Sequence, residues 1–405
     1  MKPEFNPADI ATMSDPFPSL AVLREQDPAH YSSHLKAWLV TRYDDTKRLT
    51  QDMSLSSDRL RPFFATLEAS ERDRITDIIR YLSLWMVFTD APDHTRLRRL
   101  TSHVFNAPLM NGMRALIERR VDHLLDALDG QEQINFIKDF AGPLPALVIM
   151  DMLGVPGSEL GRIKTLSDQI ALFIGSARAS EEKYNIAQAA TREMADLFLD
   201  LIAARRSEPT NDLISQLVHL QEKDTGDRLT DDELVATFIL LLFAGHETTT
   251  SLLSNGLLAM LQFPEQMQVL RDNPTLASDA VEEVLRFDGP NLSQARVAIA
   301  PVPLHDKTIE PGDRVFLMLS AANRDPRIYS NPDRLHFERE RVAHLAFGWG
   351  KHICLGFPLA RLEGQVAFPK LLARWPKIEL ADQPLNWHRS MVFRGVPDMP
   401  LRVAH

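Results

Sequence analysis

The chain of 405 residues is 44% hydrophobic and 25% charged, which provides enough apolar material for a buried core beneath a polar surface. Its 55 acidic side chains outnumber 45 Lys and Arg, and the formal net charge of -10 argues against nucleic acid as the main partner, because phosphate binding needs a cationic surface. The single cysteine, Cys354, excludes an internal disulfide and suits a reducing compartment.

Neither a secretory signal nor a membrane span is expected from the sequence. Residues 1–20 lack a basic start followed by an apolar run. The longest apolar stretch, residues 238–245, is far shorter than the roughly 20 residues of a membrane span, and His246 and Glu247 follow it. We therefore expect a soluble, cytoplasmic protein.

The N-terminal half contains one strand-like run and then mostly helical patterns. Residues 38–41 are strand-like and are ended by the turn formers Asp44 and Asp45. From about residue 93 to residue 262 the apolar spacing is mostly that of amphipathic helices. Examples cover residues 113–128, 144–153 and 184–206, with Pro and Gly at the breaks.

The clearest helix begins at Thr230, where Thr230 and Glu233 form a Thr-x-x-Glu capping box. Asp231 and Asp232 lie in its first turn and favour the positive helix end. Nothing breaks the pattern before Pro264, which predicts a helix about 45 Å or more in length.

The C-terminal third predicts a short helix, a β-rich section and a final long helix. These cover a helix at 276–287, strands at 298–304 and 314–319 about a Pro311-Gly312 turn, irregular residues 323–343 and a helix at 359–372. The whole indicates one mainly helical domain with small β-sheets, residues 1–405.

A glycine-rich loop, residues 347–356, places Cys354 directly before the last helix. Its three glycines allow backbone conformations and close approaches that other residues forbid. The positive end of the following helix stabilises a thiolate, the form of cysteine that binds metals. A tight turn that contains a small buried cysteine explains the same spacing equally well.

This loop resembles the haem-binding signature of the cytochrome P450 family, Phe-x-x-Gly-x-His-x-Cys-x-Gly. Every fixed position matches: Phe347, Gly350, His352, Cys354 and Gly356. The resemblance extends over nearly the whole chain and implies the family's triangular prism of helices around a buried haem b. It implies that Cys354 is the axial ligand of the iron, onto which its thiolate pushes electron density.

In the long helix, Gly245 and a polar cluster interrupt an apolar run. Because a mid-helix Gly costs about 1 kcal/mol relative to Ala, it needs a packing or functional reason. A helix that turns a polar face to solvent is one explanation. The resemblance implies instead that Ala244 and Gly245 lie against the haem, and that Glu247 and Thr248 supply protons to dioxygen. Many relatives carry Asp at the acid position, so Glu247 is a mild departure.

Two further motifs follow the family's order. Glu283 and Arg286 lie three residues apart on one helix face, a spacing that alone more often indicates a solvated surface pair. The resemblance implies that this pair is structural and locks the fold around the haem loop.

His94 and Arg98, at i and i+4, indicate either a basic solvated helix face or partners for buried anions. The resemblance implies that they bind the haem propionates together with Arg296 and His352.

The activity implied by the resemblance is insertion of one atom of O2 into a hydrophobic small molecule, by hydroxylation or epoxidation. Two electrons would come from NAD(P)H through a separate ferredoxin or flavodoxin. Such carriers are acidic, so docking needs a local basic patch, for which Arg96, Arg99 and Lys351 are candidates. We expect a monomer.

The resemblance implies a substrate pocket that draws on residues 61–89, 170–177, 292–295 and 391–393, which are largely apolar. The resemblance assigns to it Leu240, Phe243, Ala244, Leu292 and Val392, although ordinary core packing explains most such residues as well. Fatty acyl chains, terpenoids, steroids and polyketides all remain open as substrates.

Three other functions fit parts of the sequence. A peroxide-driven peroxygenase would share the fold, but relatives of that kind replace the acid–threonine pair that Glu247 and Thr248 retain. A haem-based sensor or carrier would need the cysteine and propionate partners but no electron donor. A purely structural helical protein leaves the order of the four motifs unexplained.

Overall fold

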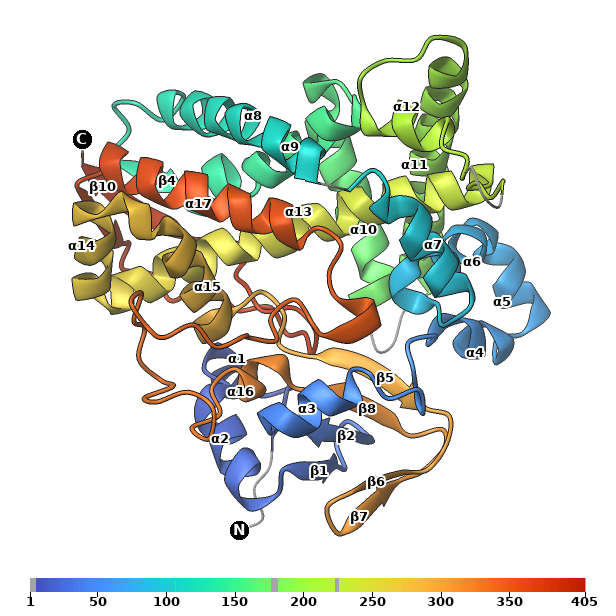
Figure 1. The fold of residues 1–405 in the computed structure, drawn as a ribbon, viewed down its shortest axis with the longest axis horizontal. Helices are drawn as coiled ribbons and strands as arrows, with labels where there is room; N and C mark the ends of the chain where they lie inside the picture. Colours follow the sequence, from blue (N-terminus) through green and yellow to red (C-terminus); the bar gives the residue numbers. More distant parts are fainter. Residues whose placement is uncertain (1–4, 106, 176–180, 223–225, 405) are drawn as a thin grey trace. The chain divides into compact units, whose positions relative to one another are not determined.

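The computed structural model describes residues 5–105, 107–175, 181–222 and 226–404. Backbone packing groups the chain into two compact units. Unit 1 comprises Met1–Ser56, Gly112–Leu144 and Glu247–His405, and unit 2 comprises Ser57–Asn111 and Pro145–His246. The structure is mainly helical with small sheets, as the sequence predicts (Figure 1).

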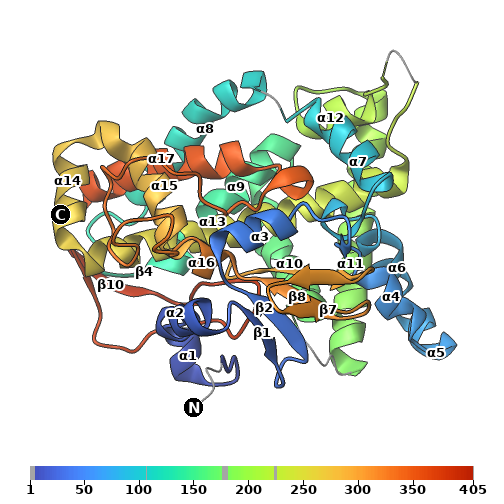
Figure 2. The ribbon, with the colours of Figure 1, turned by 60° about the horizontal axis from the view of Figure 1, so that its bottom comes forward.

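Unit 1 contains a five-stranded sheet in the order β1-β2-β8-β5-β3. Its strands are β1 Ala29–Ser32, β2 Ala37–Val40, β3 Leu55–Ser56, β5 Gln294–Ala298 and β8 Arg314–Leu317. β2 and β8 run parallel, with Val40 opposite Leu317, and the other pairs are antiparallel. The N-terminal segment is therefore held by strands from the last third of the chain, which Figure 2 shows beside it.

Two smaller sheets complete unit 1. The hairpin of β6 Val302–Leu304 and β7 Lys307–Ile309 extends beyond β5 and β8 (Figure 1). A three-stranded sheet pairs β10 Pro400–Ala404 with β4 Gln133–Asn135 and β9 Lys377–Leu380. The predicted strand at 298–304 is wrong in extent, because β5 ends at Ala298 and residues 299–301 bend before β6 begins.

The helices of unit 1 cover its sheet and build its core. They are α1 Ile10–Ser14, α2 Phe17–Gln26, α3 Tyr43–Leu49, α14 Pro264–Asp272, α15 Ala277–Asp288, α16 Leu319–Ala322 and α17 Phe357–Arg374. α15 packs along α17, and a Cβ on Gly364 of α17 would lie 2.9 Å from Val281 of α15. This close approach fixes the helix that follows Cys354 against its neighbour.

Unit 2 is helical. It contains α4 Leu60–Ala65, α5 Ala69–Arg74, α6 Thr76–Leu82, α7 Asp93–Ser102, α10 Leu160–Gly175, α11 Glu181–Ser207 and α12 Leu213–Val218. α10 packs on α11, and α11 packs on α6. The rings of Phe63, Phe64, Phe173 and Tyr184 join α4 to α10 and α11, with neighbouring centroids 5.6 to 6.3 Å apart.

Three helices continue from one unit into the other: α8 Ala107–Asp126, α9 Pro143–Leu153 and α13 Asp231–Gln262. α13 is the predicted long helix, and the capping box is present: the Thr230 amide donates to Glu233 Oε2 at 2.8 Å, and the Glu233 amide donates to Thr230 Oγ1 at 3.3 Å. By length and apolar composition α13 could cross a membrane. However, 67% of its most apolar window is buried inside the protein, as in the core helix of a globular fold.

Candidate functional site

The glycine-rich segment of residues 347–356, called the cysteine loop from here on, has a tightly constrained backbone. Gly348 and Gly350 both adopt φ of +73°, which side-chain-bearing residues rarely tolerate. A Cβ on Gly348 would also lie 2.4 Å from the side-chain nitrogen of Gln294. The Cys354 amide donates to the Phe347 carbonyl at 2.9 Å, so the two ends of the loop are joined by a hydrogen bond.

Cys354 is exposed and lies shortly before α17, which begins at Phe357. A small buried core cysteine, the alternative left open by the spacing, is therefore wrong. Gly356 follows it, and a Cβ there would meet nothing within 4 Å. An accessible sulfur beside the free amides of a helix start is an arrangement that suits a metal-binding thiolate.

Arg296 places a nearly buried guanidinium in the same unit. It lies on β5 with 7% of its surface exposed, and it donates to the Ala295 carbonyl at 2.9 Å. His352 lies half-buried in the turn Gly350–His352, two residues before Cys354. A buried guanidinium that contacts neutral oxygen suits an anionic ligand, because charge-assisted hydrogen bonds are the stronger kind.

In unit 2, α7 carries the second predicted pair. His94 is 3% exposed and Arg98 is half-buried, and their i, i+4 spacing puts both on one face. The solvated basic face is thus wrong for His94, which is buried.

Two of the three cations predicted to form a docking patch, Arg96 and Arg99, form ion pairs with acids of unit 2. Arg96 donates to Asp227 at 3.1 Å and to Glu233 at 2.6 Å, and Arg99 pairs with Asp227 at 3.0 Å and with Glu222. These acids offset the positive charge of both arginines. The sequence did not reveal this, because the pairs join residues about 130 positions apart. Lys351 belongs to unit 1 and remains exposed.

Helix packing explains the glycine in the middle of α13, Gly245. A Cβ on Gly245 would lie 2.9 Å from the side chain of Ile149 on α9, so the glycine permits a close helix contact. His246 is 5% exposed. Burial, with a smaller effect of Lys164, lowers its pKa to about 4. Ala244, Glu247 and Thr248 are half-buried.

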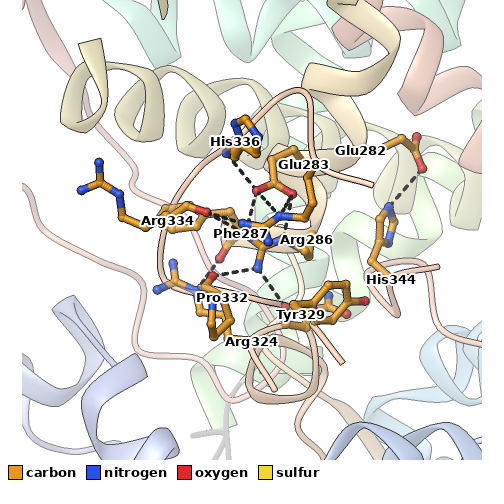
Figure 3. Close-up of polar contacts among 12 residues, drawn as sticks. Glu282, Glu283, Arg286, Phe287, Arg324, Tyr329, Pro332, Arg334, His336 and His344 are labelled. Atoms are coloured by element: carbon orange, nitrogen blue, oxygen red, sulfur yellow. Dashed lines mark hydrogen bonds and ion pairs between the residues drawn. The ribbon is translucent and has the colours of Figure 1, made fainter. Parts of the chain in front are cut away.

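The Glu283–Arg286 pair is buried, not solvated (Figure 3). Arg286 Nε and Nη2 donate to the two carboxylate oxygens of Glu283 at 2.7 and 2.8 Å. Arg339 Nε reaches the same carboxylate at 3.1 and 3.2 Å, and the His336 amide donates to it at 3.0 Å. The third guanidinium nitrogen of Arg286, Nη1, donates to the carbonyls of Asn323 and Pro332. The pair thus fixes the irregular segment that leads to the cysteine loop.

A neighbouring carboxylate, Glu282, which the sequence analysis did not single out, contacts residues on both sides of the cysteine loop. Arg361 on α17 donates to Glu282 through Nε at 2.5 Å and Nη2 at 2.8 Å. His344 Nε2 lies 3.3 Å from the same carboxylate (Figure 3). Burial raises the pKa of Glu282, but hydrogen bonds from His344 and Arg361 outweigh it and lower the pKa to about 2. Glu282 is therefore ionised at neutral pH.

The predicted pocket residues divide between the units. In unit 2, Leu240 and Phe243 are buried on α13, and the Phe243 ring lies 5.4 Å from that of Trp85. In unit 1, the Leu292 amide donates to the Val392 carbonyl at 2.8 Å. Leu292 is fully buried in a core cluster, so core packing accounts for it. Of the predicted stretch 170–177, residues 176–177 lie outside the described residues.

Comparisons with known proteins bear on the family of this chain. A family model described as "Cytochrome P450" matches residues 66–386. The chain is 35% identical to the polyketide biosynthesis cytochrome P450 PksS of Bacillus subtilis, over 99% of this chain and 98% of that protein. It is 37% identical to a vitamin D(3) 25-hydroxylase of Pseudonocardia autotrophica, over 96% of this chain and 94% of that protein.

Solved structures give the same result. P450BioI, in complex with an acyl carrier protein that bears hexadec-9Z-enoic acid, superposes with a TM-score of 0.89 at 35% identity, covering 98% of this chain and all of that one. CalO2 superposes with a TM-score of 0.90 at 30% identity, with 99% of each chain covered. The fold, mainly helical with small sheets, and the sequence matches together show that this chain belongs to the cytochrome P450 family of haem monooxygenases.

Proposed function

We propose that this protein inserts one atom of O2 into a hydrophobic small molecule, with Cys354 as the thiolate ligand of haem iron. The observation that carries the proposal is the cysteine loop, in which an exposed sulfur follows two positive-φ glycines and precedes a helix. The nearly buried Arg296 supports it, because a haem propionate would supply the anion that a buried guanidinium favours. The residues present thus fit haem.

Bound haem would supply activation of dioxygen, tuned by electron density from the Cys354 thiolate. We assign Arg296 and His352 to the propionates, and the residue pattern assigns His94 and Arg98 to the same role. The half-buried Glu247 and Thr248 would hold protons and pass them from solvent. The buried apolar side chains of Leu240 and Phe243 would contact substrate and exclude water.

The substrate class is proposed from chemistry and from the relatives. The named relatives act on or bind a polyketide pathway compound, vitamin D(3) and a fatty acyl chain, all of them largely apolar. We therefore propose an apolar substrate of similar size for this chain.

Electrons would come from NAD(P)H through a separate ferredoxin or flavodoxin. Since Arg96 and Arg99 are paired with acids, Lys351 is the better candidate for contacting an acidic carrier. We further propose a cytoplasmic monomer.

The reduced, carbon-monoxide-bound difference spectrum of the purified protein tests the central assignment, with Cys354→Ala beside it. We expect a strongly red-shifted Soret band in the wild type that the variant lacks, because only thiolate ligation gives that shift. A carbonyl spectrum that is the same in both proteins would remove Cys354 from the iron and overturn the proposal.

The same preparation distinguishes the alternatives. Substrate turnover with a ferredoxin, its reductase and NAD(P)H supports the monooxygenase. Turnover with hydrogen peroxide alone would indicate a peroxygenase, and a red-shifted band without turnover of any screened apolar compound would favour a sensor or carrier.

A further inference from the structure

Phe347, the first residue of the cysteine loop, has the side chains of Arg361 and His344 near its ring, and both of them contact the carboxylate of Glu282. The Arg361 guanidinium carbon lies 4.9 Å from the centre of the Phe347 ring, and the His344 ring centroid lies 5.9 Å from it. Both groups contact Glu282 of α15, Arg361 through two hydrogen bonds and His344 at 3.3 Å. One carboxylate thus fixes both neighbours of Phe347.

The contacts of His344 fix its tautomer. The Ala346 amide donates to His344 Nδ1 at 3.2 Å, so Nδ1 is an acceptor and the proton of the neutral ring lies on Nε2. Nε2 is the atom that faces Glu282. The side chain is 5% exposed, so this orientation is sheltered from water.

Phe347 connects these groups to the cysteine. Its carbonyl accepts the hydrogen bond from the Cys354 amide at 2.9 Å. Arg361 is the fifth residue of α17, which begins three residues after Cys354, so it ties both the start of α17 and the ring of Phe347 to α15. A shift of Phe347 would therefore move the backbone that carries the sulfur.

We propose that Glu282 is a positioning residue: by holding Arg361 and His344 against Phe347, it keeps Cys354 in the geometry that binds iron. The expected change in the Soret band rests on the proposed function, because it requires haem bound to Cys354. The expected change in the labelling rate of the Cys354 sulfur does not depend on that function. The described contacts of Glu282 are with Arg361 and His344, and it acts through Phe347. Its neighbour Glu283 holds a different segment and does not contact Arg361 in the described contacts.

The decisive experiment uses the haem-loaded protein and its single cysteine. Glu282→Gln keeps the shape of the side chain but removes the charge that organises Arg361 and His344. Because Cys354 is the only cysteine, the rate of labelling by a thiol reagent reports on that one sulfur without ambiguity. The second readout is the rate at which the carbon monoxide complex loses its red-shifted Soret band.

Asp122→Asn is the matched control. Asp122 accepts two hydrogen bonds from Lys370 at 2.7 and 2.9 Å, on the same helix α17, and the two side chains are 49% and 35% exposed. The control thus also removes a carboxylate that binds a side chain of α17, but near the end of the helix remote in sequence from Cys354. Melting temperatures of both variants measure the general loss of stability.

We expect Glu282→Gln to raise the labelling rate and the rate of band loss about tenfold, the factor that corresponds to about 1.4 kcal/mol. Arg361→Lys should lie between this variant and the wild type, since lysine keeps the charge but cannot bind bidentately. In a Phe347→Leu background the Glu282→Gln change should add little, because the residue through which it acts is gone.

The proposal is overturned if Glu282→Gln lowers the melting temperature as Asp122→Asn does but leaves both rates at the wild-type value. The proposed function fails separately if the wild type has no red-shifted band. In that case the labelling rate still decides whether Glu282 positions the cysteine loop.

Discussion

Two glutamates of unit 1 are almost equally buried but differ in their partners. Glu283 on α15 is 5% exposed and accepts hydrogen bonds from Arg286, Arg339 and the His336 amide. Glu363 on α17 is 1% exposed, and among the described residues no donor reaches its Oε2 atom. Burial raises the pKa of Glu363 well above its ordinary value of 4.5.

The difference shows that partners, not burial, decide what a buried acid does. A buried carboxylate is costly unless cations and hydrogen bonds compensate it, and Glu283 has both. Burial disfavours the charged form of Glu363 and so raises its pKa. The first residue therefore organises the segment before the cysteine loop, whereas the second lies in a core where, among the described residues, no donor reaches its Oε2 atom.

The largest expected effect is that of Glu283→Gln. The change leaves Arg286, 2% exposed, and Arg339 without their carboxylate, so the free energy of unfolding at pH 7 should fall by about 3–5 kcal/mol. Chemical denaturation followed by circular dichroism measures it.

An exposed pair provides the control for that change. Glu265 and Arg334 approach to 3.4 Å with side chains 52% and 67% exposed, so Glu265→Gln should change stability by less than about 0.5 kcal/mol. Equal losses in the two variants would show that the Glu283 network is no more important than a surface ion pair.

Only part of this network could be predicted from the sequence. The spacing of Glu283 and Arg286 indicates contact, because residues three apart share a helix face. Arg339 comes from an irregular segment 56 residues away, and Arg361 lies 79 residues from Glu282. No local pattern encodes such contacts, since they depend on how α15, α17 and the intervening loop pack together.

The fold shows the same division. The cap and length of α13, the strand at residues 37–40 and the helices at 277–288 and 357–374 follow from local composition and periodicity. The pairing of β2 with β8 and of β3 with β5 joins distant residues, and it could not be deduced from either strand alone. The resemblance assigns Leu292 to the pocket and the structure places it in a core cluster; its apolar character alone does not distinguish a pocket wall from a core.

His246, a buried base in unit 2, extends the comparison of buried ionisable groups. Its expected effect on stability is smaller and depends on pH. His246 has a pKa near 4, whereas the usual value is 6.5, so between these values the unfolded chain binds a proton that the folded protein does not. Stability is thus lost as the pH falls through 6.5 toward 4, by about 2 kcal/mol between pH 7 and pH 5.

Denaturation curves of the wild type and His246→Gln across this range measure that contribution. The variant should lose less stability on acidification, since it has no proton to bind. If both proteins show the same slope, Asp168, which opposes the shift, must hold the proton on the folded histidine.

The smallest expected change in stability, that of Glu363→Gln, has the opposite sign to that of Glu283→Gln. Because the pKa of Glu363 is raised on folding, the unfolded chain ionises above pH 4.5 while the folded protein keeps its proton, and stability is lost as the pH rises. Glu363→Gln removes this loss and should stabilise the protein at pH 7 by about 0.5–2 kcal/mol. At pH 4, where both states are protonated, the gain should vanish. Thermal unfolding at the two pH values measures both outcomes, and a destabilised variant at pH 7 would mean that the folded protein stabilises the Glu363 side chain, as the partners of Glu283 stabilise that carboxylate. The same substitution at two equally buried glutamates would then cost stability at both, and the distinction drawn from their partners would be wrong.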